Sequence, residues 1–362
     1  FKPSDWGTTG LPIIRIQNLN DERAPFNYYS GKYNLAQEVD NGDLLFSWSG
    51  TPGTSFGAFL WNRGKGVLNQ HIFKVIPKVE VEKTYLMYAL NGNISTIISK
   101  AHGGVGLQHI TKKELDEIEI QMVSISRQKE IVEILEKVSL LIFLRKQQLA
   151  KLDELVKARF VEMFGDPVSN PLHWKKVKLS ELADIKIGPF GSLLHKEDYV
   201  TGGHPLVNPS HIINGRIIVD NDLTLTEEKY FELSAYHLKK NDVVLGRRGE
   251  MGRCAVVNEE GLLCGTGSLL IRTNGTVTAD YIQKIISFPT FKKTIEDMAV
   301  GQTMPNLNVP IVSNFMIIVP PLSVQKDYYD FVERVDQQKQ TVQQSLEKLE
   351  LMKKALMQEY FG

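Results

Sequence analysis

The stretches IQMVSISRQKE (residues 120–130) and IIVPPLSVQKD (317–327) place a Ser, a Gln and a Lys at the same spacing, 197 residues apart. Each takes the chain from an apolar, strand-like run into a long segment whose apolar residues recur at helical spacing. A shift of 197 lays residues 104–165 on residues 301–362 without a gap, and both copies close on Phe-Gly. Chance does not keep register over such a span. The sequence therefore predicts an internal duplication of a unit far longer than a solenoid repeat.

The repeat continues upstream with small gaps. Tyr85 meets Tyr281, NGDLLFSWSG (41–50) meets KNDVVLGRRG (240–249), and DWGTTGLP (5–12) meets DYVTGGHP (198–205). The second copy also contains HWKKVKLSELADIKIG (173–188), for which the first copy has no counterpart. We therefore expect the first copy to lack roughly its first 20 residues.

Length and composition narrow the class of protein. A chain of 362 residues is long enough for two domains, and 42% hydrophobic with 23% charged residues is typical of a soluble globular protein. No apolar run reaches the roughly 18 residues of a membrane span. We expect a cytoplasmic protein, because the cysteines are too few for a disulfide scaffold. Cys254 and Cys264 are the only cysteines and are expected to be reduced thiols. A formal net charge of zero argues against nucleic-acid binding by bulk charge alone.

Each copy divides into a mixed part and a long helix. Short strand-like runs such as DLLFSW (43–48), DVVLG (242–246) and SLLIR (268–272), bounded by Gly, Asn and Asp, are followed by two shorter helical stretches. We predict an α/β (α+β) protein with an internal pseudo-two-fold repeat and two similar mixed domains, separated by two long antiparallel helices that form a coiled coil. The predicted domains are residues 1–123 and 166–322, and the predicted helices are residues 124–165 and 323–362.

The two long segments carry a heptad pattern, because their apolar residues are spaced alternately by three and four. Arg145, Arg159, Lys339 and Lys353 interrupt this seam. Ser126 and Ser323 are predicted to cap the helix N-termini, and Gly165 is predicted to end the first helix. A helix with one apolar stripe must bury it, either against the other helix or against its own domain, and we favour the pair. The predicted seam residues are Val138, Leu149, Leu152, Val156, Val335, Val342, Leu346 and Leu349.

Motifs that would indicate catalysis are not found in the sequence. There is no phosphate-binding G-x-x-x-x-G-K-[ST] loop and no G-x-S-x-G elbow, and the histidines have no H-x-x-x-H or H-x-E pairing for a metal. HGGVG (102–106) lacks the strand-to-helix context of a dinucleotide loop and is interpreted as a turn. The sequence gives no positive indication of an enzyme.

The two copies differ most in polar residues at strand ends and loops. Ser47-Trp48-Ser49 of the first copy becomes Gly246-Arg247-Arg248 in the second, between a shared Asp and a shared Gly. Arg, Gln and Asn are the side chains that read base edges in DNA, with Ser and His less selective. A protein that recognises two unlike DNA half-sites needs one scaffold that carries two different sets of polar side chains. Random divergence of the loops after duplication would also produce such differences.

The chain resembles the specificity subunits of type I restriction–modification systems over essentially its whole length. The strongest marks are GQTMPNLNVPIVSNFMIIVPPLSVQKD (301–327) and the helix end LAKLDELVKARFVEMFG (149–165). The first copy departs from the family pattern in having MVSISRQKE (122–130) without a Pro pair. The resemblance implies a non-catalytic subunit whose two target-recognition domains each read one half of a split double-stranded DNA target.

The resemblance also implies partners and a division of labour. The helices would set the spacing and dock two modification subunits, which bind S-adenosylmethionine, and restriction subunits would use ATP and Mg; no cofactor or metal is expected on this chain. A protein–protein scaffold with coiled-coil pairing and a cryptic nuclease are the alternatives. The residues expected to contact DNA are Arg15, Gln17, Asn18, Ser47, Trp48, Gln70, His71 and Lys100 in the first copy, and Lys196, Ser210, His211, Arg247, Arg248, Gln302 and Asn306 in the second.

Overall fold

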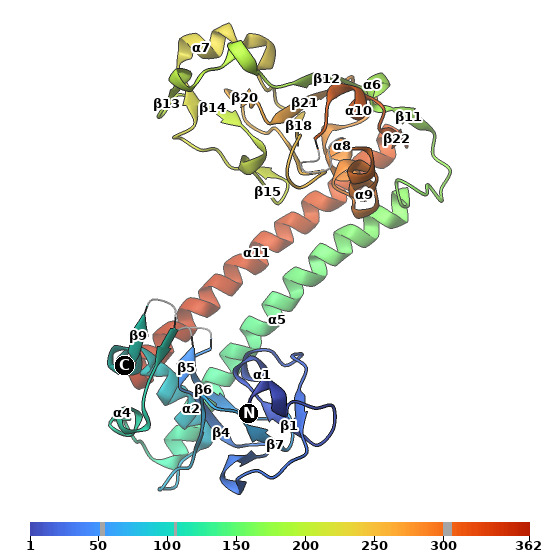
Figure 1. Ribbon diagram of the computed structural model, residues 1–362. Coiled ribbons are helices and arrows are strands. Elements are labelled where there is room, and N and C mark those ends of the chain that lie inside the picture. Colours follow the sequence, from blue (N-terminus) through green and yellow to red (C-terminus); the bar gives the residue numbers. More distant parts are fainter. Residues whose placement is uncertain (51–54, 105–106, 300–305) are drawn as a thin grey trace. The chain divides into compact units, whose positions relative to one another are not determined.

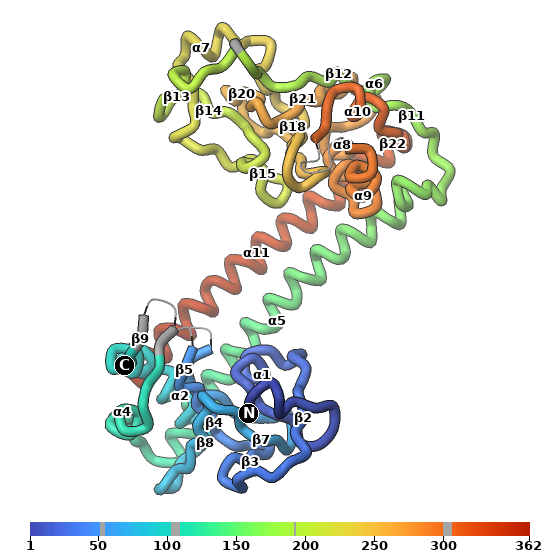
Figure 2. The backbone as a smooth tube through the Cα atoms, viewed as in Figure 1, coloured from blue at the N-terminus to red at the C-terminus, as the bar shows by residue number. Residues whose placement is uncertain are grey.

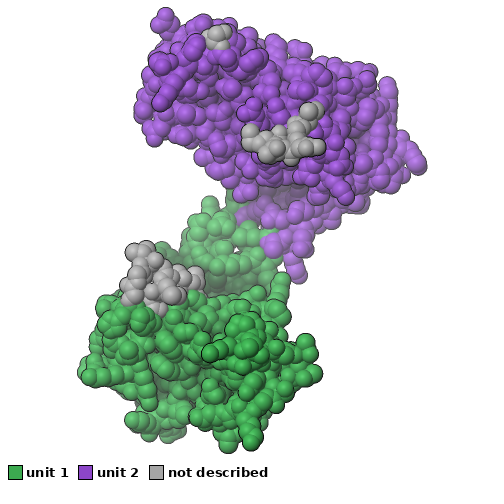
Figure 3. Space-filling model, viewed as in Figure 1, with its two compact units in different colours: residues 1–149, 340–362 green, residues 150–339 purple. Residues whose placement is uncertain are grey.

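The computed structural model describes residues 1–50, 55–104, 107–299 and 306–362, and it contains two compact units (Figures 1 and 3). Unit 1 comprises residues 1–149 and 340–362, and unit 2 comprises residues 150–339. The long helices α5 (Ile125–Phe164) and α11 (Leu322–Phe361) each contribute residues to both units. Each unit is therefore a mixed domain together with one part of each long helix, a division that differs from the segments predicted from the sequence.

Among the residues that the structure describes, unit 1 has three small sheets and four short helices besides its parts of α5 and α11. The central strand β4 (Leu44–Ser47) is buried throughout, because Leu44 and Phe46 face one apolar cluster while Leu45 faces another. The first sheet is β6 (Gly57–Leu60), β4 (Leu44–Ser47) and β8 (Ile72–Val75), all antiparallel. The second is β2 (Asn27–Tyr29), β1 (Leu11–Ile14), β7 (Gly66–Leu68) and β3 (Glu38–Val39), and the third is β5 (Ser49–Gly50), β10 (Leu107–His109) and β9 (His102–Gly104). The helices are α1 (Ile16–Asn20), α2 (Lys83–Gly92), α3 (Ile94–Lys100) and α4 (Lys112–Asp116), with 3₁₀ turns at Pro3–Asp5 and Leu35–Gln37.

Unit 2 repeats this plan with additional strands, and Figure 2 traces its path. Its main sheet is β12 (Ala183–Ile187), β21 (Ser268–Thr273), β18 (Asp242–Gly246) and β19 (Cys254–Val256). A second sheet is β13 (Tyr199–Val200), β17 (Thr224–Leu225), β14 (His204–Val207) and β20 (Leu263–Cys264); β11 (Lys176–Lys178) pairs with β22 (Met316–Ile318), and β15 (Ile212–Ile213) with β16 (Arg216–Ile217). The helices are α6 (Leu179–Leu182), α7 (Glu227–Glu232), α8 (Ala279–Ile286), α9 (Pro289–Met298) and α10 (Val309–Ser313), with 3₁₀ turns at Gly191–Leu193, Lys196–Asp198, Pro209–His211 and Ser234–Tyr236.

The segment without a counterpart in the first copy, residues 173–188, forms β11, α6 and β12. Its strand β12 pairs antiparallel with β21 and forms an edge of the main sheet of unit 2, while β11 pairs antiparallel with β22 in a two-stranded sheet. In the described part of unit 1, β8 pairs only with β4, and residues 119–121, which correspond to β22, are not assigned to a strand.

The repeated Gln explains why both copies share the same exit from strand to helix. Gln128 is buried; its Oε1 accepts a hydrogen bond from the backbone N–H of Glu82 at 2.9 Å, and its Nε2 donates to the carbonyl of Val123 at 2.8 Å. Gln325 makes the equivalent pair, accepting from Thr278 N–H at 3.0 Å and donating to the Pro320 carbonyl at 2.9 Å. A buried amide with both ends bonded ties the start of each long helix to the helix of its own domain.

A tyrosine repeats in the same way. The hydroxyl of Tyr85 donates to the carbonyl of Gln121 at 2.8 Å, and that of Tyr281 donates to the carbonyl of Ile318 at 3.0 Å. Burial raises the pKa of both phenols, so both hydroxyls stay protonated donors at neutral pH. The duplication inferred from the sequence is therefore a duplication of contacts as well as of residues.

The long helices begin and end close to the predicted positions. The predicted N-cap residues were wrong: α5 begins at Ile125, and Ser124 rather than Ser126 accepts a hydrogen bond from a first-turn N–H, that of Arg127 at 3.4 Å. Ser323 likewise lies inside the first turn of α11. The predicted stop is confirmed, since Gly165 follows the last residue of α5 at φ +73°, a left-handed conformation that glycine adopts without strain.

Within each unit the two helices pack against each other in antiparallel sense. In unit 1, the ring of Phe361 at the end of α11 contacts that of Tyr85 with centroids 5.3 Å apart; in unit 2, the ring of Phe164 at the end of α5 contacts that of Tyr281 at 5.2 Å. Each helix therefore ends on the tyrosine of the other copy. Val138, Val335, Val342 and Leu346 are buried, and the other predicted seam residues, Leu149, Leu152, Val156 and Leu349, are half-buried.

The charged residues that interrupt the seam have partners. Arg145 Nε donates to Ser345 Oγ at 3.2 Å in unit 1, and Lys339 pairs with Asp153 at 2.6 Å in unit 2. Arg159 lies over the ring of Phe331, and Lys353 over the ring of Tyr88. These contacts give each cationic group a hydroxyl acceptor, a counter-charge or an aromatic face as partner.

Candidate nucleic-acid interface

The two copies place different side chains on the same backbone at the end of their central strands. Trp48, just after β4, donates its N–H to the carbonyl of His71 and accepts from the N–H of Ile110, both at 3.0 Å. Arg247, just after β18, donates to the carbonyl of Gly267 at 2.9 Å and accepts from Leu307 N–H at 3.0 Å. The backbone hydrogen bonds at this position, which we call the frame, are therefore equivalent in the two copies, and only the side chain that the frame carries differs.

In unit 2 the two arginines of this frame have different roles. Arg247 is half-buried, and its guanidinium donates to the carbonyl of Leu307 at 3.0 Å and to that of Thr266 at 3.5 Å. Burial, with the adjacent charge of Arg248, lowers its pKa, although a guanidinium remains charged. Arg248 is exposed and has no hydrogen bond or ion pair to any described residue. Arg247 therefore supports the turn. Arg248 presents a charged guanidinium whose N–H donors have no hydrogen-bond partner among the described residues.

In unit 1 the corresponding position is an aromatic cluster. The ring of Trp48 stacks on Phe73 at 5.6 Å with an interplanar angle of 23°, and it lies 4.7 Å from the His71 ring. His71 has a φ of +78°, an uncommon conformation for a side chain of its size, which brings its ring to Trp48. Ser47 is buried and donates to the Ser49 carbonyl at 3.2 Å, while Gln70 is exposed. The structure thus brings these four predicted residues, Ser47, Trp48, Gln70 and His71, together at adjoining strand ends.

A second pair of equivalent turns follows β1 and β14. In unit 1 the buried Asn18 accepts a hydrogen bond from Arg15 N–H at 3.0 Å and donates to the carbonyls of Ala24 and Pro25, both at 3.2 Å. Its amide is therefore fully used inside the protein. Arg15 is half-buried with its guanidinium 4.5 Å from the centre of the Trp6 ring. Gln17, between them in the sequence, is exposed.

The turn in unit 2 is closed in the same manner. His211 is buried, its Nδ1 lies 2.7 Å from the Leu206 carbonyl oxygen and 3.3 Å from Asn208 N, and Ser210 before it is exposed. Asn18 and His211 thus shape the loops from inside, whereas Gln17 and Ser210 are the members of each predicted set that face solvent. Sequence reasoning grouped all of them as DNA-contacting.

The remaining predicted residues are more scattered. Lys100, at the end of α3, and Lys196 are exposed. Asn306 is half-buried, and its Oδ1 has no hydrogen-bond partner in the described part of the chain. Gln302 lies outside the described residues.

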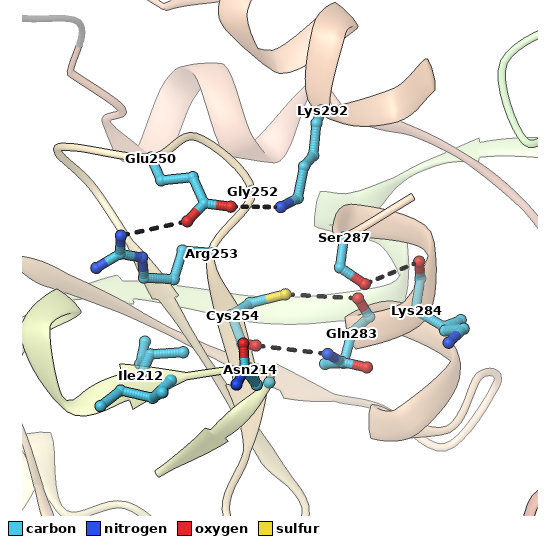
Figure 4. Close-up of a pocket in the computed structure, with 12 residues that line it drawn as sticks. Ile212, Asn214, Glu250, Gly252, Arg253, Cys254, Gln283, Lys284, Ser287 and Lys292 are labelled. Carbon is cyan, nitrogen blue, oxygen red and sulfur yellow. Dashed lines mark hydrogen bonds and ion pairs between the residues drawn. The ribbon is translucent and has the colours of Figure 1, made fainter. Parts of the chain in front are cut away.

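A charged cluster that sequence reasoning missed holds the β18–β19 turn. Glu250 accepts from Lys292 of α9 at 2.7 Å and from Arg253 at 3.2 Å (Figure 4). Arg253 also donates to the carbonyl of Pro209 at 3.2 Å. The hydrogen bond from Lys292 is the largest cause that lowers the pKa of Glu250, so the carboxylate stays ionised at neutral pH. The Glu-x-x-Arg spacing in GEMGR (249–253) was the available signal. The cluster ties the turn that carries Arg248 to α9.

This cluster lines a pocket of about 440 Å³, whose other walls are the β15–β16 turn and α8 (Figure 4). Burial raises the pKa of the Cys254 thiol at its wall to about 12, and the thiol donates to the carbonyl of Gln283. Such a thiol is protonated at neutral pH and is a poor nucleophile. Across the described residues, no group of three or more His, Cys, Asp or Glu could hold a metal ion. No helix in the described chain is long and apolar enough to cross a membrane.

The fold and these paired frames define a two-domain protein with one recognition scaffold used twice. A family model described as the type I restriction modification DNA specificity domain matches residues 1–154 and 171–351. The chain belongs to this family: it is a type I restriction–modification specificity subunit with two target-recognition domains. The protein–protein scaffold alternative is not favoured.

Individual relatives agree with this assignment. The chain is 23% identical over 339 residues to the MjaVIII specificity subunit of Methanocaldococcus jannaschii, covering 88% of this chain and 78% of that protein. It is 20% identical over 372 residues to the EcoBI specificity subunit of Escherichia coli, covering 93% and 75%.

Two solved structures share the fold. The type I restriction–modification S subunit from M. genitalium matches with a TM-score of 0.55 at 16% identity, covering all of this chain and 91% of the other. A chain from a structure described as showing complex assembly and conformational transition of a type I system matches with a TM-score of 0.63 at 15% identity, covering 98% and 92%.

Proposed function

We propose that each unit reads one half of a bipartite duplex target, with unlike bases in the two halves. The observation that carries this proposal is the equivalent frame around Trp48 and Arg247, in which identical backbone hydrogen bonds support unlike side chains. Duplicated scaffolds with exchanged recognition residues are suited to asymmetric half-sites. Arg248 is the first candidate for base reading in unit 2, because a free guanidinium can bind O6 and N7 of guanine together.

In unit 1 the proposed reading surface is aromatic and neutral. Trp48 and His71 offer ring faces and edges for apolar contact with a base or its methyl group, while the exposed Gln70 and Gln17 offer amides that pair with adenine. Lys100, Lys196 and the exposed pair Lys239 and Lys240 are proposed to contact phosphates, which position the protein without reading sequence.

We further propose that α5 and α11 set the spacing between the half-sites and dock two modification subunits. In this proposal the modification subunits bind S-adenosylmethionine and methylate adenine, and restriction subunits use ATP and Mg, so this chain contributes recognition and no chemistry. We place the complex in the cytoplasm. Partner subunits that supply much of the phosphate contact would reconcile DNA binding with the chain's zero net charge.

Sequencing of methylated DNA from cells that express the chain with its modification subunits tests the proposal. A split motif with two unlike halves and an unread gap is expected. Methylation at a single undivided motif, or none that depends on this chain, would overturn it. Exchange of residues 46–50 for the equivalent residues 245–249 should then alter one half of the motif only.

A further inference from the structure

Unit 2 contains a β-hairpin, residues 212–217, in the connection from β14 to β17. Its strands β15 and β16 are joined by Asn214 and Gly215, whose φ values are +51° and +75°, the left-handed pair that a tight two-residue hairpin turn requires. The turn lies against α8, because a Cβ added to Gly215 would be 3.0 Å from Nε2 of Gln283 (Figure 4). The hairpin is therefore packed on the body of unit 2.

Unit 1 makes the equivalent connection without a hairpin. Its strands β1 and β2 correspond to β14 and β17, because β1 pairs antiparallel with β2 and parallel with β7 as β14 does with β17 and β20. Residues 15–26 join β1 to β2, and none of them is assigned to a strand. They form α1 and a loop that Arg63 holds by donating to the carbonyls of Asn18 at 3.2 Å and Ala24 at 3.0 Å. The hairpin is thus a feature in which the two copies differ.

The hairpin has one buried and one exposed face. Ile212 pairs with Ile217; the first is buried and the second packs on the same apolar cluster. Ile213 pairs with Arg216 on the opposite face, where both are exposed. Ile218 lies two residues beyond Arg216, hence on the face of Arg216, and is 52% exposed. The exposed face therefore presents one guanidinium flanked by two isoleucines.

This face adjoins the candidate recognition residues of unit 2. The β15–β16 turn and the β18–β19 turn, which carries Arg248, are two walls of the same pocket. The strand β15 begins two residues after the exposed Ser210. Arg216, like Arg248, has no hydrogen bond or ion pair to any residue that the structure describes. Unit 2 thus has two unpartnered guanidinium groups, on turns that border one pocket.

We propose that the β15–β16 hairpin is a further base-reading element of unit 2, and that Arg216 determines specificity for a guanine of the second half-site. This inference rests on the proposed function. A two-stranded β-ribbon fits the major groove of DNA, and an unpartnered guanidinium can bind O6 and N7 of guanine together. The exposed Ile213 and Ile218 favour the groove over the phosphate backbone, because an apolar side chain finds a partner in the methyl group of thymine and none on a charged phosphate.

The test uses the full chain assembled with its modification subunits, and a duplex that carries the motif found by sequencing of methylated DNA. Each guanine of the second half-site is replaced in turn by 7-deazaguanine, which lacks the N7 acceptor, and the rate of methylation is measured. With the parent chain one guanine should be sensitive to this replacement. Arg216→Ala should remove that sensitivity and slow methylation of the unmodified duplex by about tenfold. A different guanine should respond to Arg248→Ala.

Two further variants serve as controls. Arg216→Lys keeps the charge without the planar fork, so it should retain non-specific DNA affinity while discriminating less between bases. Arg23→Ala removes an exposed arginine from the loop that joins β1 to β2 in unit 1, and it should leave recognition of the second half-site unchanged. Circular dichroism melting checks that each variant folds as the parent does.

A second half-site in which no guanine is sensitive, or a sensitivity that persists in Arg216→Ala, would overturn the inference. So would an Arg216→Ala variant that slows methylation of every duplex in the panel equally, which would assign Arg216 to a phosphate. Loss of binding to the modification subunits in Arg216→Ala would make the hairpin a protein contact and would also overturn it. These results leave the proposed function standing, whereas a parent complex that methylates no split motif would overturn the proposed function itself.

Discussion

Replacement of the repeated glutamine by methionine, a residue of similar length without the amide, should loosen one unit at a time. In Gln128→Met the N–H of Glu82 and the carbonyl of Val123 lose their partners, and in Gln325→Met the N–H of Thr278 and the carbonyl of Pro320 lose theirs. An unsatisfied buried group costs about 1–3 kcal/mol, so two such groups cost about 2–6 kcal/mol, and the apolar methionine offsets a small part of this cost.

The two replacements should not be equal. Both hydrogen bonds of Gln128 are partly buried, whereas the bond from Gln325 to Pro320 is fully buried, so we expect the larger loss in the second copy. A loss of this size is a large fraction of the stability of an ordinary domain. The variant Lys129→Met, one residue away on the exposed side of α5, is the matched control and should change stability by less than about 0.5 kcal/mol.

Hydrogen–deuterium exchange of the full chain is the suitable assay, because a two-unit protein does not unfold in one step. Gln128→Met should speed exchange in α2, and Gln325→Met in α8, each with little effect on the other. If the glutamine variants exchange no faster than the lysine control, or if either one loosens both units equally, the hydrogen bonds described here do not hold the helices to their domains.

Further predictions concern recognition, spacing and pH. Arg248→Ala should weaken one half-site by about 1–3 kcal/mol, measured as methylation of single-base target variants, with Arg248→Lys retaining phosphate affinity but not base selectivity; equal loss at both half-sites would contradict the assignment. Insertion of one heptad into both α5 and α11 adds about 10.5 Å, or about three base pairs, and should lengthen the unread gap without changing the bases read, as methylome sequencing would reveal. Burial acts to raise the pKa of Asp43, but the hydrogen bonds from Lys74 and from the backbone of Asp40 outweigh it and hold that pKa below its ordinary value. The stability that this carboxylate contributes to unit 1 is therefore present at neutral pH and lost as pH falls below about 4, and Asp43→Asn should flatten acid-unfolding curves in that range.

The sequence by itself was sufficient for the duplication, the heptad seam and the end of α5 at Gly165. These features are local or periodic: a repeated register such as Gln128 with Gln325, an apolar residue at each third or fourth position, and a glycine after the last turn can all be recognised without knowing what they contact. The family resemblance rested on the same kind of pattern. The predicted bounds of both long helices were accurate to a residue or two. The capping residue of α5 was missed, because Ser124 and Ser126 are equally plausible caps in the sequence.

Which polar residues are free to meet a ligand was decided only by the tertiary structure. Asn18 and Gln17 are one residue apart and similar in chemistry, yet the first is consumed by three backbone hydrogen bonds and the second faces solvent. Arg247 and Arg248 differ in the same way. The division of the long helices between two units is likewise tertiary, since Phe164 contacts a tyrosine 117 residues away in the chain and Phe361 contacts one 276 residues away. Burial and partnership depend on neighbours brought together from distant parts of the chain, and composition and periodicity do not encode which neighbours those are.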